Sequence, residues 1–229
     1  MQFTNLVCRY CVSTGTSRPL LCAVGLALTN VFVFPSQGGF LIPNASFEEP
    51  DQEPGMFSVN ELVPHWEGSG GVWDISTKPF GLWNSTAPDG NQVLYVGIYP
   101  SFEPSYFKQR TGANASAGVS YVLSGMVGHP IGYGPSRGAT YTVAILAGND
   151  IVASVTSAGP EGSFAPFMVS WTATESSQGA RLDVGLYSNG GQAAFDQISF
   201  AAVPEPRSAI ITGIAGLLIL TVRRLQWRS

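Results

Sequence analysis

Residues 140–156, TYTVAILAGNDIVASVT, contain the pattern that decides the fold class. Two runs in which apolar and small residues alternate with polar ones flank Gly148, Asn149 and Asp150, which are residue types that favour tight turns. Because successive side chains of a strand point to opposite faces, such alternation places one face in a core. This stretch therefore predicts an antiparallel hairpin.

The same signals recur along the chain on both sides of the hairpin. Short runs rich in Val, Ile, Tyr, Phe and Thr lie between clusters of Gly, Pro, Asn and Asp, without a long helical period. The predicted strands are 70–76, 92–98, 119–128, 139–147, 150–157, 164–173, 180–188 and 193–201. We therefore predict an all-β fold, an antiparallel β-sandwich of the jelly-roll kind, over residues 40–202.

The charges of the 229-residue chain are unevenly distributed. All fifteen acidic residues lie in residues 40–206 with only five of the eleven basic ones, so this segment has a net charge of 5 − 15 = −10. An acidic surface repels nucleic acid, which is therefore not an expected partner. The three cysteines, Cys8, Cys11 and Cys22, all precede this segment, so its fold needs no disulfide.

Both ends of the chain combine an apolar run with arginine. The run after Arg18 is typical of a secretory signal, so residues 1–39 are predicted to be a leader, with an uncleaved anchor as the alternative. Residues 208–222 are apolar on every side and predict a short membrane helix, with a core helix of a soluble domain as the alternative. At about 1.5 Å per residue this helix is shorter than a bilayer core of about 30 Å.

The end of the chain resembles the PEP-CTERM sorting signal of Gram-negative bacterial surface proteins. The resemblance rests on Val203, Pro204, Glu205 and Pro206, the short apolar helix, and then Arg223 and Arg224, all within residues 203–229. It implies export, a transient inner-membrane anchor through the helix, processing by an exosortase-type enzyme, and release to the cell surface or the extracellular matrix.

Residues 40–206 resemble the galactose-binding-like sandwich of many carbohydrate-binding modules. The resemblance rests on LIPNASFEEP (41–50), LVPHWEGSGGVWDIS (62–76), APDGNQVLYV (87–96) and GQAAFDQISFAAVPEP (191–206). It implies a structural Ca²⁺ between the first and last strands, with Glu48, Glu49 and Asp196 as candidate ligands, because carboxylate oxygens suit this ion. Surface acids unconnected with a metal are the alternative.

Three tryptophans are candidate carbohydrate-binding residues, because a sugar ring can stack on an exposed indole. Trp83, in KPFGLWNSTAPDG, is surrounded by turn-forming residues and is the best candidate for an exposed platform, with ordinary packing as the alternative. Trp66 and Trp73 are flanked by strand-like sequence, so both are predicted to lie in the core, with a sugar contact as the alternative.

Catalytic motifs are absent from the sequence. The only histidines are His65 and His129, and neither G-x-S-x-G, H-E-x-x-H nor a phosphate-binding loop occurs. We therefore predict a non-catalytic, exported surface protein with extracellular polysaccharide as its candidate ligand. The alternatives are an extracellular polysaccharide-acting enzyme with a jelly-roll catalytic domain and a purely structural protein.

Overall fold

The computed structural model describes residues 38–58, 62–97 and 105–204, which form two antiparallel sheets. The first sheet contains β1 (Gly38–Phe40), β3 (Gly70–Asp74), β4 (Gln92–Val96), β6 (Val119–Gly128), β9 (Phe164–Thr172) and β11 (Ala193–Pro204). The second contains β2 (Glu67–Gly68), β5 (Ser105–Asn114), β7 (Thr140–Ala147), β8 (Asp150–Ser157) and β10 (Arg181–Asn189). Three 3-10 turns lie in the connections: η1 (Pro79–Gly81), η2 (Pro135–Arg137) and η3 (Glu175–Ser177).

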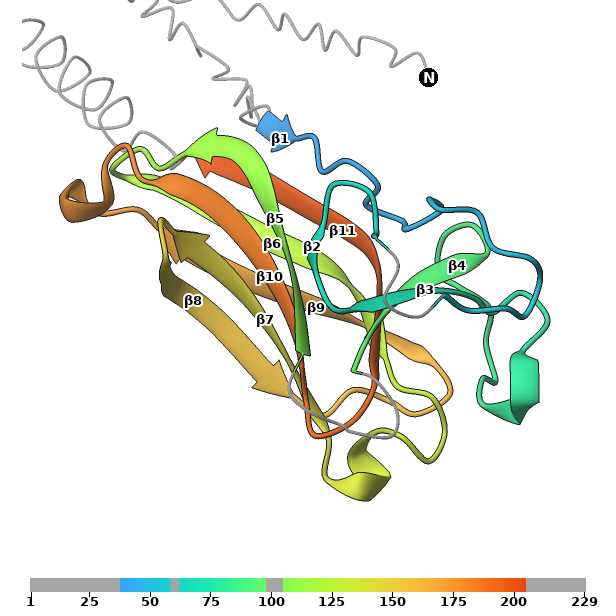
Figure 1. Ribbon diagram of the computed structural model, residues 1–229. Helices are drawn as coiled ribbons and strands as arrows, with labels where there is room; N and C mark the ends of the chain where they lie inside the picture. The colour runs from blue at the N-terminus through green and yellow to red at the C-terminus, as the bar shows by residue number, and fades with distance from the viewer. Residues whose placement is uncertain (1–37, 59–61, 98–104, 205–229) are drawn as a thin grey trace, which may run out of the picture. The chain divides into compact units, whose positions relative to one another are not determined.

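The two sheets pack face to face as a sandwich (Figure 1). The strand order is β3-β4-β11-β6-β9 in the first sheet, where β1 also pairs with β11, and β2-β5-β10-β7-β8 in the second. The predicted all-β antiparallel sandwich is confirmed.

The predicted hairpin at residues 140–156 is also confirmed. β7 and β8 are antiparallel, and Ala147 pairs with Asp150 across a turn formed by Gly148 and Asn149. Gly148 has a φ of 66°, a left-handed conformation that glycine adopts without a steric penalty.

The inner faces of both sheets contribute to one core, which includes Phe107 of β5, Leu123 of β6 and Leu186 of β10. A second, smaller cluster contains Trp73, Ile75, Trp83, Val93, Tyr95 and Ala194. Because neighbouring residues of a strand face opposite ways, β3 and β4 contribute to both clusters. The second cluster therefore covers the other side of these strands.

Several predictions made for the ends of the chain fall outside the described residues. These are the leader, except for its last two residues, the helix at 208–222, and Glu205, Pro206, Arg223 and Arg224. Val203 and Pro204 are described, and they pair with Ser120 and Val119 at the end of β11. Within the described ranges, no helix is long and apolar enough to cross a membrane.

Candidate functional site on the second sheet

A pocket of about 340 Å³ lies at the outer face of the second sheet, where β5 and β10 pair. This volume falls in the range of small-molecule sites. The lining residues are Pro43, His65, Glu67, Lys108, Gln109, Arg110, Arg181 and Asp183. The pocket is therefore strongly charged, although the segment that contains it has few basic residues.

The alternation of β5 explains how these side chains reach the outer face. Phe107 is buried in the core, whereas Tyr106 and Arg110 are exposed and Lys108 is half-buried. The register of β5 and β10 brings three rows of residues together: Tyr106 with Tyr187, Lys108 with Gly185, and Arg110 with Asp183. One end of the face is thus aromatic and the other is charged.

Asp183 is the centre of the charged end. Its side chain is fully buried, and both oxygens accept hydrogen bonds of 2.9 Å from the guanidinium of Arg181. The Nζ atom of Lys108 lies 3.4 Å from Oδ2 of Asp183. A buried carboxylate is tolerated only when it is paired and hydrogen-bonded, and these two cations supply both conditions. The hydrogen bonds to Asp183 and its negative charge raise the pKa of the Arg181 guanidinium.

The aromatic end is formed by Tyr187 and Tyr106, whose ring centroids lie 5.9 Å apart at an interplanar angle of 35°. The ring of Tyr187 lies directly over Gly185. A Cβ atom added to this glycine would be only 2.7 Å from the ring. Burial raises the pKa of the Tyr187 hydroxyl, and the neighbouring Tyr106 adds to this shift. The two rings provide an apolar surface beside the Asp183 cluster.

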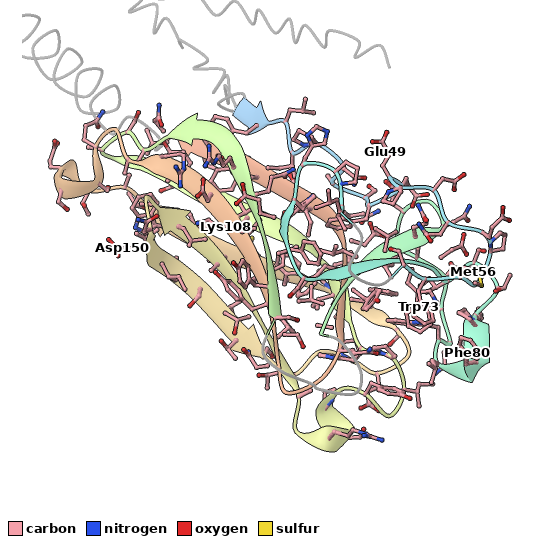
Figure 2. All side chains as sticks on the ribbon, in the orientation of Figure 1. Glu49, Met56, Trp73, Phe80, Lys108 and Asp150 are labelled. Atoms are coloured by element: carbon pink, nitrogen blue, oxygen red, sulfur yellow. The ribbon has the colours of Figure 1, made fainter. Side chains whose placement is uncertain are left out.

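This combination can bind a small aromatic molecule and supply it with a proton. An ammonium group carries three N–H donors, so Lys108 retains donors when one is directed at Asp183. The side chain of Lys108 is 25% exposed, which leaves it accessible from the pocket. Figure 2 shows Lys108 over the β5–β10 region, far from Trp73 and Phe80 at the other end of the sandwich.

The structure brings two of the predicted calcium ligands to one loop. Oε1 of Glu48 accepts hydrogen bonds from the backbone N–H groups of Asn91 and Gln92, at 3.1 and 2.9 Å. Oδ2 of Asp196 accepts one from the backbone N–H of Asp89, at 2.8 Å. Burial raises the pKa of Asp196 to about 7, and the negative charges of Asp89 and Glu48 contribute to this shift.

Glu49 does not join this pair. Its side chain is exposed and points outward in Figure 2, and its backbone is hydrogen-bonded to Asn44. Among the residues that the structure describes, no three His, Cys, Asp or Glu side chains are arranged to hold a metal ion. The side-chain geometry thus brings together Glu48 and Asp196 and leaves Glu49 apart.

The three tryptophans proposed as sugar platforms are buried: Trp66 is 4%, Trp73 5% and Trp83 2% exposed. The ring of Trp83 stacks on Phe164, with centroids 4.9 Å apart and an interplanar angle of 3°. The turn-rich segment around Trp83 folds back over β3 and β4, and this packing covers the indole. Trp83 is therefore packed, as the alternative interpretation of its sequence has it, and the exposed platform is not present.

The two histidines occupy different surroundings. His65 is exposed and lines the pocket. His129 is fully buried, and its Nδ1 lies 2.5 Å from the carbonyl oxygen of Gln192. Burial lowers the pKa of His129, so the neutral ring is favoured at this position. We infer that His129 has a structural role, because it is buried in the β6–β7 connection and hydrogen-bonded to the backbone.

None of the four charged residues Lys108, Arg110, Arg181 and Asp183 was predicted from the sequence to be a site residue. A signal for them was present, because residues 40–206 contain only Lys78, Lys108, Arg110, Arg137 and Arg181 as bases, and three of these five line the pocket. The grouping of these three cations in one pocket is what the sequence alone did not show, because Lys78 and Arg137 lie outside it.

The comparisons with known proteins point to enzymes. A family model described as HpiC1-like, HpiC1 cyclase, matches residues 40–201. Among solved structures, a Stig cyclase, Fisc, from Fischerella sp. TAU in complex with (3Z)-3-(1-methyl-2-pyrrolidinylidene)-3H-indole is 21% identical. The match covers 75% of this chain and 100% of that chain, with a TM-score of 0.65.

A second structure, a cyclase from Fischerella sp. TAU in complex with 4-(1H-indol-3-yl)butan-2-one, is 21% identical with a TM-score of 0.63. The match covers 73% of this chain and 98% of that chain. An apo form of a cyclase from Fischerella sp. is 22% identical over 75% of this chain and 98% of that chain, with a TM-score of 0.64. At these identities the structures show a shared fold. No curated protein matches the chain.

The family match corrects several expectations drawn from the sequence. The identification as a PEP-CTERM surface protein with a carbohydrate-binding body was wrong, and so were the exosortase and polysaccharide partners. The prediction of a non-catalytic protein was also wrong, since the matching family and structures are cyclases; the alternative of an enzyme was the better one. From the match over residues 40–201, we conclude that this chain belongs to the HpiC1-like cyclase family.

Proposed function

We propose that this protein is a cyclase that closes a ring in a small indole-containing molecule bound on the outer face of the second sheet. The observation that carries the proposal is the buried Asp183 in the pocket wall, held by Arg181 and Lys108 beside two tyrosines. The family membership supports the reaction class. The indole ligands in the Fischerella cyclase structures support the substrate class.

Tyr187 and Tyr106 are the proposed binding surface for the indole. Aromatic rings favour offset-stacked or edge-to-face contacts at centroid distances of about 4.5–7 Å. The tyrosine pair already has such a spacing, and Tyr106 is 49% exposed, so it can accept a third ring. The substrate then lies beside the charged cluster without displacing a core side chain.

Lys108 is the proposed proton carrier. A proton given by the ammonium to an imine-type ring nitrogen makes the adjacent carbon electrophilic, and the electron pair of a nearby double bond can form the new C–C bond there. The resulting cation loses a proton to the Lys108 amine, so the product is an isomer of the substrate. Asp183 acts on Lys108 and Arg181 as a positioning residue, because these cations cover its carboxylate.

The reaction proposal can be tested with the full chain. We expect calorimetry to detect binding of 4-(1H-indol-3-yl)butan-2-one, and liquid chromatography with mass spectrometry to detect products of unchanged mass from indoles with an alkenyl side chain. Lys108→Ala should abolish the product, whereas Asp150→Asn, a change of charge in the β7–β8 turn, should not. Absence of both binding and isomerisation would refute the proposal, as would full activity of Lys108→Ala.

We propose that Glu48 and Asp196 hold a structural Ca²⁺. The buried Asp196 has two acidic neighbours and no ion pair among the described residues, so its surroundings favour a cation. When bound, the ion would neutralise these carboxylates and tie the first loop to β11. An unchanged melting temperature on addition of Ca²⁺ to EDTA-treated protein would contradict this role.

We propose that the chain is exported, with residues 1–39 as the leader, residues 40–202 as a jelly-roll domain and residues 208–222 as a membrane-seeking helix. The arginine-flanked apolar runs support export and membrane contact, and the two antiparallel sheets support the domain type. N-terminal sequencing of the mature protein, combined with cell fractionation, tests the proposal. An intact N-terminus on protein from the cytosol would contradict it.

A further inference from the structure

The cations of the sandwich are concentrated in one place. The acidic segment 40–206 has a net charge of −10, yet three of its five bases line the pocket together with two acids, Glu67 and Asp183. The formal charge of the pocket, with His65 neutral, is therefore 3 − 2 = +1. A positive pocket in an acidic protein attracts an anion locally while the remaining surface repels it.

One of these cations has no ion-pair partner among the described residues. Lys108 and Arg181 both make ion pairs with Asp183. Arg110 stands directly across from Asp183 in the β5–β10 register, but the carboxylate is already occupied by the other two cations. The guanidinium of Arg110 is exposed and lines the pocket, so its N–H donors can reach a ligand there.

The position of Arg110 relative to the tyrosines sets the length of such a ligand. Tyr106, Lys108 and Arg110 lie on the same face of β5 at intervals of two residues, or about 7 Å. A ligand whose ring stacks on Tyr106 and Tyr187 therefore needs only a short arm to reach the Lys108 row. The Arg110 side chain is long enough to extend back to the Lys108 row and to bind the end of the ligand's side chain there.

From this arrangement we infer that the substrate carries a carboxylate on a short side chain, and that Arg110 binds this carboxylate while the indole lies on Tyr106 and Tyr187. The planar guanidinium can donate two parallel N–H bonds to the two carboxylate oxygens. The inference rests on the proposed function, since it assigns a substrate class to the same site, and it makes Arg110 a specificity-determining residue.

Two probes of equal size test the inference with the full chain. In 3-(1H-indol-3-yl)propanoate, a carboxylate oxygen replaces the methyl group of the neutral ketone 4-(1H-indol-3-yl)butan-2-one. We expect calorimetry to show that the carboxylate binds about tenfold more tightly, the gain typical of a charge-assisted hydrogen bond. This preference should shrink when the salt concentration is raised from about 50 mM to about 500 mM, because added ions screen the guanidinium.

Variants assign the preference to one side chain. Arg110→Gln should abolish the tenfold preference and leave the affinity for the ketone unchanged. Arg110→Lys should retain part of it, because the charge remains and the paired N–H geometry is lost. Arg137→Gln removes a positive charge from η2, outside the pocket, and should retain the full preference. Melting temperatures of all variants show whether each is folded.

The outcomes separate the inference from the proposed function. Preferential binding of the carboxylate that depends on Arg110 supports both. Equal binding of the two probes, tighter binding of the ketone, or a preference that persists in Arg110→Gln overturns the inference and leaves the indole site standing. Binding of neither probe overturns the inference, and if isomerisation of alkenyl indoles is absent as well, the proposed function falls with it.

Discussion

Replacing Gly185 with alanine tests the position of the Tyr187 ring over Gly185, on which the proposed binding surface depends. A Cβ atom at position 185 would lie 2.7, 2.8 and 3.1 Å from three atoms of the Tyr187 side chain. Ordinary contacts begin near 3.4 Å, so the ring would have to move by about 1 Å. Gly185 does not have a left-handed φ, so the substitution strains the ring contact and not the backbone.

The size and sign of the effect depend on whether Tyr187 is present. Overpacking costs roughly 1–3 kcal/mol, and the lower half of this range applies because the half-buried Tyr187 can tilt toward solvent. Replacing a strand glycine with alanine by itself raises the free energy of unfolding by about 0.5–1 kcal/mol, because alanine has less backbone entropy to lose. We therefore expect Gly185→Ala to lower the free energy of unfolding by up to about 1 kcal/mol in the native background. In a Tyr187→Ala background, Gly185→Ala should raise the free energy of unfolding by about 0.5–1 kcal/mol.

A double-mutant cycle measured by urea unfolding provides the assay. All variants are made in the full chain, which retains residues 1–39. Gly39→Ala is the control, because a Cβ atom added there would have no other atom within 4 Å and the φ of Gly39 is not left-handed. Gly185→Ala should also weaken binding of 4-(1H-indol-3-yl)butan-2-one, because the displaced ring leaves its position beside Tyr106. Identical effects of Gly185→Ala in the two backgrounds, together with unchanged binding, would refute the proposed position of Tyr187.

Three further predictions concern buried groups. Trp83→Ala should lower the free energy of unfolding by about 3–5 kcal/mol, because the indole is 2% exposed and stacked on Phe164; a loss below about 1 kcal/mol in urea titration would contradict its burial. The pKa of His129 is lowered in the folded state, so its contribution to stability is present above pH 6.5 and declines as the pH falls below that value; His129→Gln should flatten this part of the stability–pH curve, and an unchanged slope would argue against it. Calcium should raise the melting temperature more at about pH 8 than at about pH 5.5, because the carboxylate of Asp196, whose pKa is about 7, must be ionised to bind the ion; Asp196→Asn should remove the increase, and an increase that persists would exclude Asp196 as a ligand.

The sequence predicted the strands whose inward positions are apolar. All eight predicted strands are present with ends that differ by only a few residues, and the β7–β8 turn lies where the Gly148-Asn149 pair indicated. In these strands apolar residues alternate with polar ones or follow one another without a break. Both patterns indicate burial from the local sequence alone.

β5 was not predicted, and it carries two of the pocket cations. Its buried positions are Ser105, Phe107, Gln109, Thr111 and Ala113, so three of its five inward side chains are polar. Gln109 and Thr111 are accommodated by hydrogen bonds to the carbonyl oxygens of Pro43 and Leu182. These partners lie 66 and 71 residues away in the chain, and no local pattern could indicate them.

The pocket could not be predicted for the same reason. Asp183 and Lys108 are 183 − 108 = 75 residues apart, and only the pairing of β5 with β10 brings them to 3.4 Å. Glu48 and Asp196 could be associated from sequence because both belong to short motifs at the two ends of the sandwich. For Trp83 the sequence left packing and exposure both open, because its burial depends on a turn-rich segment folding over β3 and β4.

The most direct test of the account is a crystal structure of the full chain with 4-(1H-indol-3-yl)butan-2-one bound. We predict that the indole ring contacts Tyr106 and Tyr187 and that the ketone oxygen is directed toward Lys108 in the pocket of about 340 Å³. An indole bound on the first sheet beside Trp73, or near Glu48 and Asp196, with the β5–β10 face empty, would contradict it.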